Sequence, residues 1–183
     1  MFLSKIEPLP IQIDHRLIMK GFPDTDIPNP RAHWKILFRI EPDGSTLVQS
    51  QIHPNWANVL PKGAVQTREY TIPTLQQGVR LVFRCAVNAT MRRDSDKKDI
   101  PVSVDDWFQR RQDLGGNFDV KASSVKRLLD RSGRNYVPIC LVMAEGIVTV
   151  ANPDQFADSL ANGIGKRRSY GCGLLSVRKI QES

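Results

Sequence analysis

The same order of strands and helices can be traced twice along this chain of 183 residues. Each half reads strand, helix, two strands, helix, strand, which is the order of the ferredoxin-like unit. In the first half we expect strands at 2–6, 35–40, 46–50 and 64–72, a helix at 14–21 and a helical turn at 56–60. In the second half we expect strands at 79–88, 117–121, 136–150 and 172–178, and helices at 103–115 and 153–163.

Alternation, turns and caps support these boundaries. Strand 79–88 alternates large apolar residues with polar ones, and strand 35–40 places Arg39 opposite the apolar face that contains Ile40. Ser103 and Asp106 form a variant of the capping box, and Asn152 before a proline opens the last helix. Within the long stretch 136–150 we expect one bent strand or two, with an interruption at Gly146.

The predicted fold class is therefore α+β, a tandem of two ferredoxin-like units. We expect an N-terminal domain at 1–75 and a C-terminal domain at 76–183. The halves share no repeat of residues, so a single larger α+β sandwich with unrelated halves remains the alternative.

The charge favours a polyanionic partner. Lysine and arginine total 26 against 19 aspartate and glutamate, a formal charge of +7. No run of 18 apolar residues occurs, so no membrane partner is expected, and residues 1–9 are interrupted too early for a signal peptide. We expect a cytoplasmic protein.

No metal or other cofactor is expected. Cys85, Cys140 and Cys172 lie far apart and form no CxxC pair, which is typical of reduced core residues. A zinc site assembled from distant cysteines and histidines is the alternative, and their spacing does not favour it.

The positive charge is concentrated in two segments. One surrounds a single acid in a polar, loop-like stretch, and the other lies near the C-terminal end of the chain. The first segment contains Lys121, Lys126, Arg127, Arg131 and Arg134. The second contains Lys166, Arg167, Arg168, Arg178 and Lys179. A third cluster, Arg92, Arg93, Lys97 and Lys98, is diluted by three aspartates. Each segment is either a solvated face or a contact for phosphates.

Glycines change the interpretation of the second segment. Four glycines between 163 and 173 surround Lys166, Arg167 and Arg168, and glycine lets backbone N–H groups approach an anion closely. The loop is no P-loop, because Leu160 and Arg167 replace required residues, and Arg168 breaks the dinucleotide pattern. A nucleic-acid backbone fits several separate basic clusters better than a nucleotide cofactor does.

His15 is the candidate catalytic group. It opens the first expected helix beside Asp14, where unpaired helix N–H groups favour phosphate. Such a residue suits cleavage of RNA by its own 2′-hydroxyl, which needs proton transfer and cations on the phosphate. An ordinary histidine at a helix start is the alternative.

Four motifs resemble one known family. They are HRLIMKGFP at 15–23, LVQS at 47–50, VFRCAVN at 82–88 and GIGKRRSYGCGLLS at 163–176. They are similar to the CRISPR RNA-processing endoribonucleases of type I-E systems, the CasE family. The resemblance implies a tandem ferredoxin-like fold of the RAMP type. It also implies a protein that binds the repeat hairpin of precursor crRNA and cuts it at the 3′ base of the stem without a metal. The products implied are a 2′,3′-cyclic phosphate and a 5′-hydroxyl, with the mature crRNA kept and other Cascade subunits as partners.

The resemblance also assigns residues. His15 matches the family's catalytic histidine, and Gln12 stands where the family has an assisting tyrosine, so Tyr170, Ser169 or Lys166 is expected to assist. The basic stretch 126–134 corresponds to a hairpin that contacts the RNA stem. The expected RNA contacts are Arg16, Lys20, Arg84, Arg92, Lys126, Arg127, Arg131, Arg134, Lys166, Arg167 and Arg168. Because the tyrosine is missing, a non-cleaving subunit that binds the crRNA hairpin remains an alternative, as does an unrelated basic ferredoxin-like protein.

Overall fold

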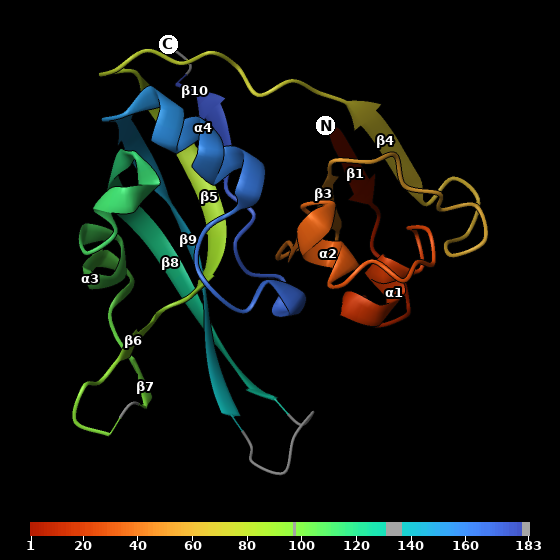
Figure 1. The fold of residues 1–183 in the computed structure, drawn as a ribbon, viewed down its shortest axis with the longest axis horizontal. Helices are drawn as coiled ribbons and strands as arrows, with labels where there is room; N and C mark the ends of the chain where they lie inside the picture. The colour runs from red at the N-terminus through yellow and green to blue at the C-terminus, as the bar shows by residue number, and fades with distance from the viewer. Residues whose placement is uncertain (97, 131–136, 181–183) are drawn as a thin grey trace.

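The described residues form two four-stranded antiparallel sheets and one two-stranded sheet (Figure 1). The computed structural model describes residues 1–96, 98–130 and 137–180. The first sheet has the order β2-β3-β1-β4. The elements of this half are β1 (Phe2–Ile6), α1 (His15–Met19), α2 (Pro30–His33), β2 (Leu37–Ile40), β3 (Thr46–Ser50) and β4 (Val65–Glu69).

The second half repeats this arrangement. Its sheet has the order β10-β5-β9-β8. When the four strands of each sheet are numbered in chain order, the first strand lies between the third and the fourth in both sheets. The elements are β5 (Arg80–Asn88), β6 (Thr90–Arg92), β7 (Asp99–Pro101), α3 (Val104–Gln109), η1 (Gln112–Leu114), β8 (Gly116–Asp130), β9 (Val137–Val150), α4 (Pro153–Asn162), η2 (Arg168–Tyr170) and β10 (Ser176–Lys179). The predicted tandem of ferredoxin-like units is confirmed.

Each half has its own hydrophobic core. In the second half, the apolar face of β5 packs against α3 and α4, with Phe83 and Phe156 almost fully buried. In the first half, Ile18 of α1 packs with Phe38 of β2 and with Trp56. Period-two alternation therefore predicted the inner face of β5 correctly.

The predicted helix caps are also confirmed. The backbone N–H of Asp106 donates to Ser103 Oγ at 3.0 Å, and Ser103 Oγ donates to the Asp106 carboxylate at 2.7 Å. Asn152 Oδ1 accepts from the backbone N–H of Gln155 at 3.1 Å. The helix after Ser103 is shorter than predicted, since it ends at Gln109 and a 3-10 turn follows before the glycines.

The segment after residue 121 differs from the prediction of a polar loop. β8 continues to Asp130 and pairs with β9 throughout, so the two strands form one long hairpin. The predicted interruption of the strand at Gly146 was also wrong, because β9 is continuous. The irregularity is a β-bulge on the facing strand β8, where Lys121 is the extra, unpaired residue. A Cβ on Gly146 would lie 2.0 Å from the Asp119 carbonyl oxygen, so glycine is required there for close approach.

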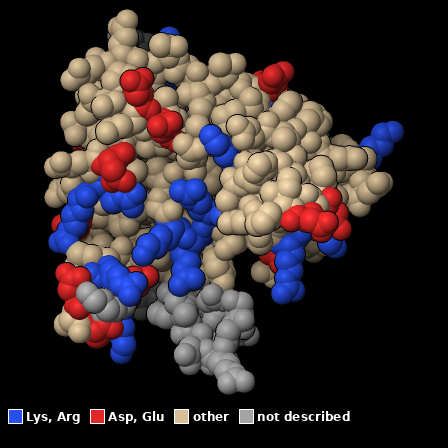
Figure 2. Space-filling view, viewed as in Figure 1, with Lys and Arg blue, Asp and Glu red and all other residues tan. Residues whose placement is uncertain are grey.

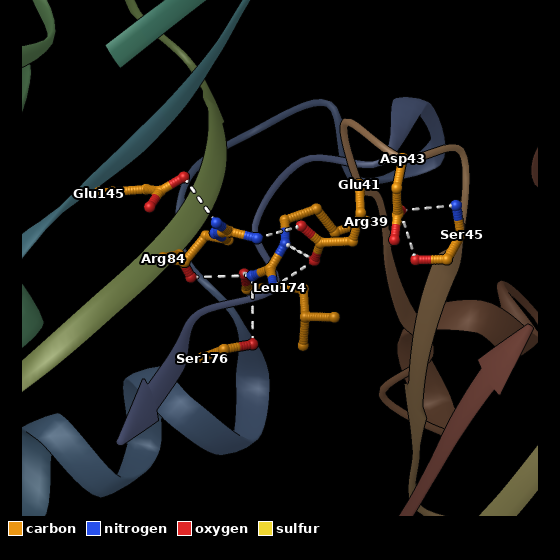
Figure 3. Close-up of polar contacts among 8 residues, drawn as sticks. All are labelled: Arg39, Glu41, Asp43, Ser45, Arg84, Glu145, Leu174 and Ser176. Atoms are coloured by element: carbon orange, nitrogen blue, oxygen red, sulfur yellow. Dashed lines mark hydrogen bonds and ion pairs between the residues drawn. The ribbon is translucent and has the colours of Figure 1, made fainter. Parts of the chain in front are cut away.

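Arg39 lies on the face of β2 opposite Phe38, as the alternation predicted, yet this face is buried as well. Arg39 is 2% exposed, whereas Ile40 is 42% exposed. Figure 3 shows the guanidinium of Arg39 at the junction of the two halves. Its Nη1 donates to the carbonyl oxygens of Arg84 at 2.8 Å and Leu174 at 2.9 Å, and its Nε donates to Glu41 at 2.8 Å. A buried side chain of the first half is thus bonded to backbone of the second.

Candidate functional site

His15 lies in a basic pocket beside α1. The pocket, of about 540 Å³, is also lined by Arg16, Lys20 and Arg31. Asp14 fixes the start of the helix, because its carboxylate accepts from the backbone N–H of Leu17 at 2.8 Å. His15 is therefore positioned by the N-cap residue directly before it in the sequence. The predicted RNA contacts Arg16 and Lys20 line the same pocket.

The imidazole of His15 has an unused buried nitrogen. Nδ1 is buried and has no hydrogen-bond partner among the described residues. Burial, reinforced by the positive charge of Arg31, lowers the pKa of His15 below its usual value, and Asp14 opposes this shift. The imidazole is therefore neutral near pH 7 and able to accept a proton.

Arg31 is a member of this site that sequence reasoning missed. It lies on α2, is half-buried, and its Nη1 donates to the carbonyl oxygen of Ile36 at 3.4 Å. Burial lowers the pKa of this guanidinium. Arg31 is an isolated cation in a stretch rich in proline, so no charge cluster marks it in the sequence. Pro30 at the first helical position indicates a helix start there, but not what Arg31 faces.

The glycine-rich loop between α4 and β10 packs against the first half. A Cβ on Gly163 would lie 2.6 Å from Leu37 Cδ1, and one on Gly171 would lie 3.3 Å from Phe38 Cε2. The backbone N–H of Ile164 donates to Gly173 O at 2.9 Å. These glycines therefore allow close packing between the two halves. Some backbone N–H groups of the loop donate to carbonyl oxygens of the fold and are not available to an anion.

This packing brings Arg168 to the side of the junction where Arg31 lies. Nη2 of Arg168 donates to the carbonyl oxygen of Gly163 at 3.2 Å, and the residue is half-buried. Burial lowers the pKa of Arg168, and the charges of Arg31 and Arg111 lower it further. Arg31 thus influences both His15 and Arg168, which come from opposite halves of the chain.

The three residues expected to assist His15 are separated by the fold. Lys166 lines a pocket with Arg111, Arg168 and residues of α4. Tyr170 lines a different pocket, with Ile40 and residues of β9. Ser169 lies between them on η2 and is half-buried. None of the three is among the residues that line the His15 pocket.

The other expected RNA contacts have diverse surroundings. Arg84 is held by two carboxylates, Glu41 at 2.9 Å and Glu145 at 2.8 Å, which indicates a structural role at the junction (Figure 3). Arg92 is exposed at the end of β6. Lys126 and Arg127 lie in the β8 part of the hairpin, and Arg167 is half-buried with a left-handed backbone, φ +62°. Arg131 and Arg134, like Lys97 of the third basic cluster, lie outside the described residues.

Positive side chains gather on one face of the molecule. Figure 2 shows them along the lower middle of this view, beside the junction of the two halves. Within residues 1–96, 98–130 and 137–180, no three histidine, cysteine, aspartate or glutamate side chains are grouped as a metal site would require. In the same residues, no helix is long and apolar enough to cross a membrane.

Gly163→Ala tests the packing between the loop and β2. We expect a loss of about 1–3 kcal/mol of unfolding free energy, because the new Cβ would collide with Leu37 and the backbone has φ +72°. Urea unfolding measures this loss. Gly63→Ala is the matched control, since Gly63 also has positive φ, +82°, but nothing lies within 4 Å of the position that its new methyl group would take. Equal losses in both variants would contradict the proposed collision.

Comparisons with known proteins identify the family and support the fold. The family model described as "CRISPR associated protein" matches residues 9–179. The CRISPR-associated endoribonuclease Cse3 of Thermus thermophilus is 27% identical over 168 residues, which are 78% of this chain and 79% of that protein. A structure of Thermus thermophilus Cse3, bound to an RNA representing a pre-cleavage complex, has a TM-score of 0.75 at 23% identity and covers 97% of this chain and 98% of that one.

A chain in a CRISPR RNA-guided surveillance complex has the same fold. Its TM-score is 0.72 at 24% identity, and the match covers 98% of this chain and 100% of that chain. At such identities the likeness to solved structures shows the fold alone, whereas the family model extends over nearly the whole sequence. The chain therefore belongs to the family of CRISPR-associated proteins, as its resemblance to the CasE family of type I-E systems predicted.

Proposed function

We propose that this protein is a metal-independent endoribonuclease that processes precursor CRISPR RNA. It binds the repeat hairpin and cuts at the 3′ base of the stem. It then keeps the mature crRNA and joins other Cascade subunits. The observation that carries the proposal is the placement of His15, whose pKa is lowered by burial, in a pocket lined by three cations, Arg16, Lys20 and Arg31, and one acid, Asp24. The name of the Thermus thermophilus relative, an endoribonuclease, supports the reaction class.

The reaction follows from the state of His15. The neutral imidazole accepts the proton of the 2′-hydroxyl at the cleavage site, and the 2′-oxygen forms a bond to the adjacent phosphorus. The bond from phosphorus to the 5′-oxygen breaks, and that oxygen takes a proton from solvent water, while the imidazolium of His15 later returns its proton to solvent. The products are a 2′,3′-cyclic phosphate and a 5′-hydroxyl, and every bond change is accounted for without a metal.

RNA binding is assigned to the positive side chains on either side of the junction. Arg16 and Lys20 are exposed on and beside α1, and Lys166 is exposed in the glycine-rich loop. Strand β8 adds Lys126 and Arg127, and the proposal also includes Arg131 and Arg134, which lie outside the described residues. Several separate phosphate contacts predict an affinity that falls steeply with salt. Relatives solved with RNA and in a surveillance complex support both partners.

One assay tests the proposal directly. The purified protein is incubated in EDTA with RNA of the CRISPR repeat encoded beside its gene, and the ends of the products are analysed. Cleavage at the 3′ base of the stem with a cyclic phosphate supports the enzyme. Tight, salt-dependent binding without any cyclic product would instead identify a non-cleaving crRNA-binding subunit, which the missing tyrosine at position 12 keeps under consideration.

The pH dependence of cleavage reports on His15. Because burial and Arg31 lower its pKa, we expect kcat/KM to decline on the acid side at a lower pH than an unperturbed histidine would produce. Asp14→Asn removes the one charge that raises this pKa while an asparagine still caps the helix, so the decline should move to lower pH. A decline that moves to higher pH, or does not move, would contradict this assignment of charges.

A further inference from the structure

Two half-buried guanidinium groups face the junction without a negative partner. Among the described residues, neither Arg31 nor Arg168 forms an ion pair with a carboxylate, and each is anchored by one hydrogen bond to a carbonyl oxygen. This differs from Arg39 and Arg84, which are paired with Glu41 at the same junction. Keeping two like charges partly desolvated and near each other costs free energy unless an anion binds between them.

A short series of contacts links the two anchors. Arg31 donates to Ile36 O, and the next residue, Leu37, packs on Gly163. The carbonyl oxygen of Gly163 is in turn the acceptor for Arg168. The two arginines are thus attached to neighbouring points of one packed interface, one on each side. Arg31 lines the pocket of His15, and Arg168 lines the neighbouring pocket that contains Lys166 and Arg111.

Resting on the proposed function, we propose that Arg31 and Arg168 together bind the scissile phosphate and that Arg31 is the second catalytic group of this chain. The position of the family's tyrosine is occupied by Gln12, which cannot supply a positive charge or an acidic proton. Arg31 supplies charge instead. Its guanidinium donates to the non-bridging phosphate oxygens, whose negative charge grows as the 2′-oxygen attacks.

The same placement contributes to the lowered pKa of His15. Burial lowers this pKa most, and Arg31 lowers it further because a nearby cation disfavours the protonated imidazole, so both favour a ring that can accept a proton. Binding of the phosphate then offsets the charge of Arg31 and favours protonation of His15. One residue would thereby hold the substrate and prepare the base.

The first test needs no cleavage. His15 is followed by NMR through its ring C–H signal in wild type, Arg31→Gln, Arg31→Lys and Arg168→Gln, while inorganic phosphate is added. We expect phosphate to raise the pKa of His15 in wild type and to bind at least tenfold more weakly to both glutamine variants. Without phosphate, Arg31→Gln should raise the pKa of His15, and Arg31→Lys should keep it low. Equal phosphate binding by all four proteins would overturn the anion site.

The second test measures the reaction at saturating repeat RNA. We expect single-turnover cleavage by Arg31→Gln to fall about 10²–10³-fold, as for other donors to a developing negative charge. Arg31→Lys should recover at least tenfold of that loss, which a purely structural role of Arg31 would not produce. Arg68→Gln, an exposed arginine of the edge strand β4, is the control.

The two tests fail in distinguishable ways. If wild type binds phosphate through Arg31 but cuts no repeat RNA, the anion site stands and the proposed endoribonuclease does not. If wild type cuts the RNA and Arg31→Gln cuts it within threefold of that rate, the proposed function stands and the role of Arg31 is overturned.

Discussion

His15→Ala will abolish cleavage of the repeat hairpin while leaving its affinity nearly unchanged. Proton transfer by a positioned histidine contributes about 10²–10⁴-fold to a rate, and the loss here should lie at or above the top of that range, because no other described histidine lines the pocket. Binding depends on many lysine and arginine contacts, so removing one neutral ring changes it little. Single-turnover cleavage in EDTA measures the first effect, and titration of a hairpin with a 2′-deoxy residue at the cleavage site measures the second.

A matched histidine controls for unrelated damage. His53 is exposed, and its ring packs edge-on against Phe2 with centroids 4.9 Å apart, so His53→Ala should cleave at the wild-type rate. Full-rate cleavage by His15→Ala would end the assignment of proton transfer to this residue. A parallel loss of affinity would indicate that the ring helps to build the RNA surface.

Arg39→Ala will lower the free energy of unfolding by about 3–5 kcal/mol, the usual cost of removing one partner from a buried ion pair. The substitution leaves the carbonyl oxygens of Arg84 and Leu174 without this donor. It also leaves Glu41, whose side chain is 9% exposed, with Arg84 as its remaining ion-pair partner. Urea unfolding followed by circular dichroism measures the loss.

Two comparisons sharpen this result. Arg80→Ala, at the exposed start of β5, should change stability by less than about 0.5 kcal/mol. Arg39→Ala combined with Glu41→Gln should be less destabilised than the sum of the single variants, because the two side chains pair directly and their shared ion pair is lost only once. A loss below about 1 kcal/mol in Arg39→Ala would show that the halves do not depend on this network.

Most of the fold was predictable because its signals are local. The alternation along β5 identifies the buried face, and side-chain caps at Ser103 and Asn152 identify helix starts. Only the family resemblance indicated a hairpin, at 126–134. The local pattern missed the continuation of β8 beyond residue 121, since its strands pair through backbone hydrogen bonds and β8 carries many polar residues there. Such a stretch has no periodic apolar pattern to distinguish it from a loop.

The site was predictable only in part, for a related reason. His15 follows from its cap and from the family resemblance, and Arg168 from its cluster. Arg31 and Arg39 are single cations whose surroundings are created by contacts between halves. Alternation assigns Arg39 to one face of β2, but it does not indicate that another domain covers that face. Pairings between distant segments leave no mark in the local sequence.

The packing of the glycine-rich loop on β2 has a consequence for protein synthesis. The ribosome makes His15 and Arg31 early, whereas Arg168 arrives only after both sheets have most of their strands. A nascent chain that stops before Gly163 retains the histidine but lacks one of the two arginines that we propose bind the phosphate. The chain would then gain its full activity on precursor crRNA only after translation has passed the loop, and incomplete chains would not cut that RNA efficiently.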